Sequence, residues 1–129
     1  MDTRFGFQRV FAWQKSHEFV LLVYRITRHF PEEEKFGLTS QFRRAATSIE
    51  ANIAEGYKKL SKADKLRFFN ISQGSMEECR DYIILACDLG YINNEEFNTL
   101  CDSIEHTSRI LNSYCEGVVN NNAMKNDPI

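Results

Sequence analysis

The sequence contains no apolar run or leader motif that would direct the protein to a membrane. Its longest apolar run, residues 19–24, has six residues, whereas spanning a bilayer takes roughly 18–20. The first four residues lack the basic region, apolar core and cleavage site of a signal peptide. We therefore expect a cytoplasmic protein without a membrane partner.

Cysteine and histidine do not occur in the clusters that hold metal ions. The four cysteines are far apart and form no CxxC pair, and the three histidines are isolated. These residues are Cys79, Cys87, Cys101 and Cys115 with His17, His29 and His106. The pattern is typical of reduced thiols that pack as small apolar side chains, so we expect no metal and no cofactor.

Catalytic signatures are missing as well. A di-iron helical bundle needs Glu-x-x-His pairs that project inward, but no Glu in this chain is followed by His three positions later. There is no P-loop, HExxH or GxSxG motif. The sequence therefore favours a protein that is not an enzyme.

One stretch, residues 41–56, is rich in small side chains and organises the rest of the chain. Large apolar residues recur through and just before it at helical spacing, namely Leu38, Phe42, Ile49 and Ile53. Small side chains allow neighbouring helices to approach closely. This stretch is therefore predicted to be the central helix of a bundle.

Periodicity predicts four helices within a chain of 129 residues, which suits one domain. They cover about 12–29, 39–59, 62–89 and 93–119, after an extended arm at 1–11 and before a disordered tail at 120–129. Thr39 or Ser40, Ser61 and Asn93 or Asn94 are the expected N-caps, and Gly90 is the expected terminator. Short connections predict an all-α, antiparallel up-down-up-down four-helix bundle over residues 1–119.

The second and third predicted helices are expected to be antiparallel neighbours, because only a short turn at Leu60-Ser61 joins them. Paired residue numbers then sum to about 122, which places Ser48 opposite Gly74, Arg44 opposite Glu78 and Asn52 opposite Asn70. The predicted seam and assembly residues are Arg43, Arg44, Ser48, Asn52, Glu55, Gly74, Ser75 and Glu78. We interpret them as packing and register contacts, with a ligand pocket as the alternative.

Charge is unevenly distributed along the chain. Residues 1–70 carry 13 Lys and Arg against 8 Asp and Glu, and residues 71–129 carry 3 against 10. A basic corner is predicted where the second and third helices meet, formed by Lys58, Lys59, Lys62, Lys65 and Arg67. Such a corner can neutralise phosphates without reading sequence; the alternative is an ordinary solvated corner.

Several short motifs in residues 13–91 resemble a known group of small bacterial proteins. They are Trp13-Gln14-Lys15, Phe30-Pro31, Gly37-Leu38-Thr39-Ser40-Gln41, Arg43-Arg44-Ala45, Ser48-Ile49, Asn52-Ile53-Ala54-Glu55-Gly56, Gly74-Ser75 and Leu89-Gly90-Tyr91. The group is the four-helix-bundle family encoded in intervening sequences of 23S rRNA genes, also called the S23 ribosomal protein family. The accessory protein of diversity-generating retroelements looks related. The chain departs from the family pattern at Glu50, where proline is frequent, and at Gln73, where a basic residue is frequent.

The resemblance implies a ring-like homopentamer without catalysis. For the retroelement relative it implies binding to a reverse transcriptase and to nucleic acid. Two classes of function follow as expectations. One is a nucleic-acid-binding or ribonucleoprotein accessory scaffold, with RNA, DNA or a nucleic-acid-processing protein as partner. The other is a purely structural or protein-interaction oligomer without nucleic-acid contact.

Overall fold

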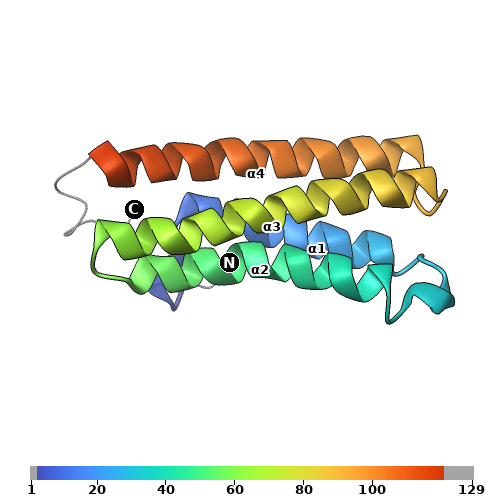
Figure 1. Ribbon diagram of the computed structural model, residues 1–129, viewed down its shortest axis with the longest axis horizontal. Coiled ribbons are helices and arrows are strands. Elements are labelled where there is room, and N and C mark those ends of the chain that lie inside the picture. Colours follow the sequence, from blue (N-terminus) through green and yellow to red (C-terminus); the bar gives the residue numbers. More distant parts are fainter. Residues whose placement is uncertain (1–2, 121–129) are drawn as a thin grey trace.

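Four long helices and two short 3₁₀ segments make up residues 3–120, the part that the computed structural model describes (Figure 1). The elements are η1 (Gly6–Arg9), α1 (Phe11–Thr27), η2 (Glu32–Glu34), α2 (Leu38–Lys58), α3 (Lys62–Asp88) and α4 (Asn94–Asn120). The predicted all-α four-helix architecture is confirmed. The tail predicted to be disordered lies outside the described residues, except for Asn120, which ends α4.

Consecutive helices run antiparallel, as the contacts between α2 and α3 illustrate. Near the start of α3, Lys65 Nζ lies 2.7 Å from the carbonyl oxygen of Tyr57 near the end of α2. Farther along α3, Ser75 Oγ lies 2.9 Å from the Oγ of Ser48, in the middle of α2. The α2–α3 turn therefore lies at one end of the bundle, and the α1–α2 and α3–α4 connections lie at the other (Figure 1).

The core lies along the inner faces of all four helices. Its largest fully buried side chains are Phe19, Phe42, Phe69, Ile49, Ile53, Met76, Ile83, Leu100, Ile104 and Leu111. The apolar stripe predicted for the central helix is buried throughout, and α2 contacts α1, α3 and both 3₁₀ segments. Within residues 3–120, no helix is long and apolar enough to cross a membrane.

The N-terminal arm is not extended, contrary to the prediction. Residues 6–9 form the 3₁₀ turn η1, which packs on the same chain. The Phe7 ring meets Trp13 edge-on, with centroids 5.2 Å apart. Gly6 lies against Tyr57, so close that a Cβ on Gly6 would sit 2.5 Å from the Tyr57 hydroxyl oxygen. The arm is therefore anchored on the end of α2 and is not free to seek another subunit.

Three of the predicted helix-end signals are confirmed, and one is wrong. Ser61 accepts the Asp64 N–H, Gly90 has a φ of +78°, and Asn93 accepts the Glu96 N–H. The prediction that Thr39 or Ser40 caps α2 is wrong, because α2 already begins at Leu38. The exposed N–H groups of its first turn attract an acceptor from outside the helix instead.

That acceptor is Glu34 of η2. Its carboxylate accepts the Leu38 N–H at 3.0 Å and the Tyr91 hydroxyl at 2.8 Å. The backbone bond to Leu38, followed by the bond from Tyr91, lowers the Glu34 pKa from its ordinary value of 4.5. Glu34 thus ties the start of α2 to the segment that follows α3.

Replacing Glu34 with alanine should lower the melting temperature at neutral pH, with a smaller effect in acid. Because the folded pKa lies below the unfolded one, the carboxylate stabilises the fold above the unfolded pKa. That stabilisation disappears as pH falls through the folded pKa. Melting curves at about pH 7 and about pH 3 measure this. Glu33→Ala, at the exposed neighbour, is the control, and a Glu34→Ala deficit of equal size at both pH values would contradict the assignment.

Candidate nucleic-acid interface

Three cations of the predicted basic corner are available to an outside partner. Lys58 and Arg67 are exposed and Lys59 is half-buried. The Lys59 ammonium and the Arg67 guanidinium both lie over the Phe68 ring, 4.9 and 4.7 Å from its centroid. Arg67 also lies 3.7 Å from Asp64. The corner therefore presents cations that are ordered by an aromatic side chain.

Lys65 does not belong to this surface, and here the sequence prediction is wrong. The residue is only 8% exposed. Its ammonium donates to the carbonyl oxygens of Tyr57 and Gly56, at 2.7 and 3.4 Å. These carbonyls lie in the last turn of α2, where i→i+4 partners run out; the Gly56 oxygen also accepts the N–H of the C-cap residue Lys59 at 3.1 Å. Burial lowers the Lys65 pKa, and the residue acts as a cap for α2.

Lys62 connects two helices while remaining partly exposed. Its ammonium donates to the carbonyl oxygen of Val119 at 3.4 Å, which joins the start of α3 to the end of α4. A cation at a helix C-terminus is electrostatically favourable. Lys62 therefore adds charge to this end of the bundle and also has a structural contact of its own.

The docked arm brings further positive charge to this end of the bundle, which was not predicted from the sequence. Arg4 and Arg9 are exposed and flank the segment that lies against Tyr57. We call this region the basic end; its exposed and partly exposed cations are Arg4, Arg9, Lys58, Lys59, Lys62 and Arg67. The acids in residues 3–9, 57–67 and 114–120 are Asp64 and Glu116. Cations that are gathered in one place create an electric field that attracts anions.

The α2–α3 seam is polar and tightly packed, but its pairing differs by one residue from the prediction. Ser48 meets Ser75 and not Gly74: the two hydroxyl oxygens are 2.9 Å apart. Gly74 is exposed, and a Cβ built on it would have no neighbour within 4 Å. The predicted close crossing of Ser48 and Gly74 is therefore wrong.

The other seam residues close a hydrogen-bonded network. Asn52 donates to the carbonyl oxygen of Ser48 at 2.8 Å and to its hydroxyl at 3.1 Å, and Asn70, its predicted partner, is exposed. One turn away on α3, the buried Ser72 hydroxyl donates to the carbonyl oxygen of Ile49 at 2.8 Å. In residues 3–120 no buried side-chain nitrogen or oxygen lacks a hydrogen-bond partner. This closed network supports the packing interpretation over a ligand pocket.

The two arginines of α2, Arg43 and Arg44, have different surroundings. Arg43 turns towards α1: its Nε donates to Thr27 Oγ1 at 2.8 Å, and its guanidinium lies 4.6 Å from the centre of the Tyr24 ring. Arg44 is exposed, and no ion pair within 4 Å joins it to Glu78 in the described part of the chain. The ion pair expected between Arg44 and Glu78 is therefore not formed.

The remaining seam residues lie at the surface. Glu78 accepts a 3.4 Å hydrogen bond from the hydroxyl of Tyr82, and Glu55 is exposed on α2. The same Tyr82 hydroxyl lies 3.1 Å from Oε1 of Gln41 on α2, so Glu78 lies beside a surface contact between the two helices and apart from the buried serine network.

The two residues that depart from the family pattern, Glu50 and Gln73, both make contacts between helices. Glu50 lies 2.7 Å from Nδ1 of His17 on α1, and the His17 ring stacks on Trp13 with centroids 4.8 Å apart. Gln73 donates to the side chain of Asn112 on α4 at 2.7 Å. The Glu50–His17 pair was not predicted, because residue numbers can be paired across a short turn only for the second and third helices, and His17 lies on α1.

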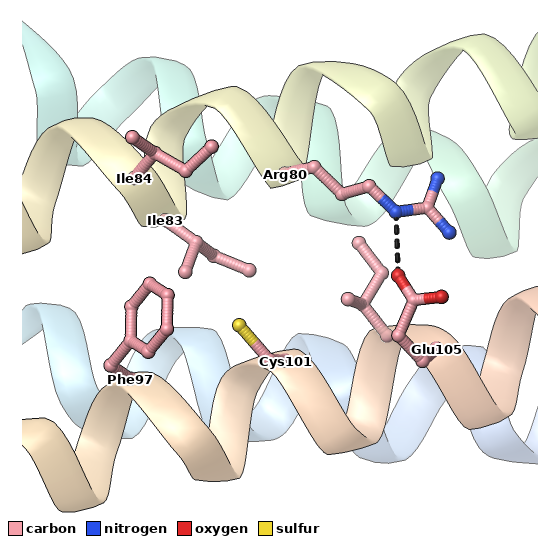
Figure 2. A pocket seen from close by; sticks show the side chains of 7 residues that line it. Arg80, Ile83, Ile84, Phe97, Cys101 and Glu105 are labelled. Atoms are coloured by element: carbon pink, nitrogen blue, oxygen red, sulfur yellow. Dashed lines mark hydrogen bonds and ion pairs between the residues drawn. The ribbon is translucent and has the colours of Figure 1, made fainter.

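A separate apolar groove runs between α3 and α4 (Figure 2). Its volume is about 190 Å³, and its lining residues are Arg80, Ile83, Ile84, Phe97, Cys101, Ile104 and Glu105. Arg80 Nε donates to Glu105 at 2.7 Å at one side of the groove. Desolvation by burial raises the pKa of the Cys101 thiol, which disfavours the nucleophilic thiolate. The groove can therefore receive an apolar side chain but does not supply an activated nucleophile.

The fold and this site define a small four-helix bundle with a serine-lined α2–α3 seam and a basic end. The family of 23S rRNA-intervening sequence proteins matches residues 8–113, and the chain belongs to this family. A crystal structure of a protein of unknown function from the S23 ribosomal protein family of Bacteroides thetaiotaomicron is similar, with a TM-score of 0.74 and 26% identity. The match covers 81% of this chain and 95% of that one. No curated protein matches the chain.

Proposed function

We propose that the protein is a non-catalytic accessory scaffold that binds RNA or DNA through its basic end. The observation that carries the proposal is the gathering of outward cations where the arm, the α2–α3 turn and the end of α4 meet. Phosphate contacts supply most of the affinity in sequence-independent binding. The family's name, 23S rRNA-intervening sequence protein, agrees with an RNA partner.

The geometry favours recognition of the phosphate backbone over recognition of bases. Phe68 is half-buried, and Lys59 and Arg67 already lie over its ring. A nucleobase could stack there only by displacing one of these cations. Binding should therefore be tolerant of sequence and sensitive to salt.

We further propose that the scaffold is a homo-oligomer, with the pentamer that the resemblance implies. On α1, Leu21 and Tyr24 are 55% and 38% exposed and share one side of the helix. This apolar surface is available for contact with another subunit. In a ring, the basic ends of all subunits would face the same way and their fields would add.

Reversing the charge of two exposed lysines should abolish binding. We expect Lys58→Glu/Lys59→Glu to lose detectable affinity for fluorescently labelled RNA and DNA at about 50 mM salt. Arg28→Glu/Lys35→Glu changes net charge equally at exposed residues of the opposite end and should bind like the wild type. Lys65→Met removes a cation that points into the bundle and should change affinity little. Fluorescence anisotropy measures all four proteins.

The outcome separates the two classes of function. Wild-type protein that binds neither RNA nor DNA, or a lysine variant that binds equally well, would leave a structural or protein-interaction oligomer. Sedimentation of the same samples tests the assembly. At high salt, where contacts between charged ends are screened, all four proteins should sediment alike. A single 15.0 kDa species for the wild type there would overturn the oligomer.

A further inference from the structure

The end of the bundle opposite the basic end is acidic. It consists of the α1–α2 connection and the α3–α4 connection, which lie together (Figure 1). Its acids are Glu32, Glu33, Glu34, Asp88, Glu95 and Glu96, and its bases are Arg28 and Lys35. We call this region the acidic end. Because α3 alone spans 27 residues, or about 40 Å at 1.5 Å per residue, the two ends are far apart on one molecule and cannot neutralise each other.

Each end also presents one large apolar side chain that is almost completely exposed. Phe36 is 89% exposed at the acidic end, and Leu60 is 94% exposed at the basic end. Scattered apolar residues are common on protein surfaces, so exposure alone does not identify an interface. These two residues differ from the others because each protrudes from a connection at an end of the bundle where charges of one sign are in excess. At the acidic end the excess is not complete, since the Lys35 ammonium lies 5.6 Å from the centre of the Phe36 ring.

We infer that the acidic end of one copy binds the basic end of the next, head to tail. Phe36 of one molecule would pack beside Leu60 of the other, and Glu32 and Glu33 would face Lys58 and Lys59. Like ends repel, so the contact is heterologous: each molecule uses a different surface on its two sides. A heterologous contact along one axis does not close on itself and allows an open row of subunits or rings.

The inference goes beyond the proposed function and does not depend on it. If nucleic acid also binds the basic end, the phosphates compete with the acidic end of the neighbouring copy, and binding disassembles the row. If no nucleic acid binds, the end-to-end contact remains. The contact weakens with salt because opposite charges at the rim of an interface are screened.

Two variants with one blocked end each provide the test. The first, Phe36→Ser/Glu32→Gln/Glu33→Gln, blocks the acidic end, and the second, Leu60→Ser/Lys58→Gln/Lys59→Gln, blocks the basic end. All six residues lie in or next to connections and outside the core, so both variants should melt as the wild type does. Light scattering gives the mass of each protein, alone and mixed, with salt at about 50 mM and about 1 M.

At low salt, the mass of the wild-type particle should increase with protein concentration, to at least about twice the mass measured at high salt. Each variant alone should stay at the high-salt mass. An equal mixture should form pairs, because one intact acidic end meets one intact basic end, but nothing longer. A wild-type mass that is independent of salt and concentration, variants that still grow alone, or a mixture that does not pair would each overturn the inference.

Discussion

Replacing Ser75 with leucine should destabilise the protein by about 1–3 kcal/mol or more, the usual range for overpacking a well-filled site. Ser75 is 5% exposed, and its hydroxyl lies 2.9 Å from that of Ser48 across the α2–α3 seam. A leucine side chain cannot fit there unless the two helices move apart. Ser48 would also lose a hydrogen-bond partner, which adds to the penalty.

Gly74 provides a matched control one residue away. The same leucine at Gly74 would point into open space, since no atom of another helix lies within 4 Å of a Cβ at that position. It should stabilise α3 by somewhat less than about 1 kcal/mol, because glycine is a poor residue for a helix interior. Urea unfolding of the two variants decides the matter. Leucine that is tolerated in place of Ser75 but harmful in place of Gly74 would contradict the observed register and restore the sequence-based pairing.

Replacing Gly56 with alanine should also destabilise the bundle, although alanine is the better helix former by about 1 kcal/mol. A Cβ at Gly56 would lie 2.6 Å from Cε1 of Phe69 and 3.0 Å from Cβ of Phe68. Phe69 is fully buried and has no room to retreat. The strain should outweigh the helical gain and leave a net loss on the order of 1–2 kcal/mol.

Gly74→Ala is the comparison for Gly56→Ala. It should raise stability by about 0.5–1 kcal/mol, because the helix loses its costly glycine and no clash replaces it. Both variants can be measured by thermal melting and urea unfolding. A Gly56→Ala protein more stable than the wild type would show that Phe69 can move aside, and that the close approach of α2 and α3 at this point is not required.

Helix identity could be read from the sequence, because apolar residues recur at helical spacing and the ends carry clear signals. The cap of α2 could not be read from the sequence. It is the carboxylate of Glu34, which lies in a separate 3₁₀ turn and comes within 3.0 Å of the Leu38 N–H. Side-chain pairing across the seam failed for a geometric reason. An error of one residue rotates a helical position by roughly 100°, which moves Gly74 from the seam to solvent and puts Ser75 in its place.

The basic end was predicted in part. Lys58, Lys59 and Arg67 face outward, but Lys65 lies on the buried stripe of α3 with Phe69, Ser72 and Met76. That spacing was present in the sequence, but a lysine is normally expected outside the core. A long apolar stem allows burial when the ammonium finds acceptors, and the carbonyls of Tyr57 and Gly56 supply them. The arm could not be placed from the sequence, because its docking depends on Tyr57 far along the chain.

The most direct test of nucleic-acid binding by the basic end is the salt dependence of RNA affinity, compared for the wild type and Lys58→Gln/Lys59→Gln. We expect log K to fall linearly with log salt for the wild type. The slope should be shallower for the variant by about 1.4–1.8, since each phosphate contact contributes about 0.7–0.9. Undetectable wild-type binding at about 50 mM salt, or identical slopes for the two proteins, would contradict the account.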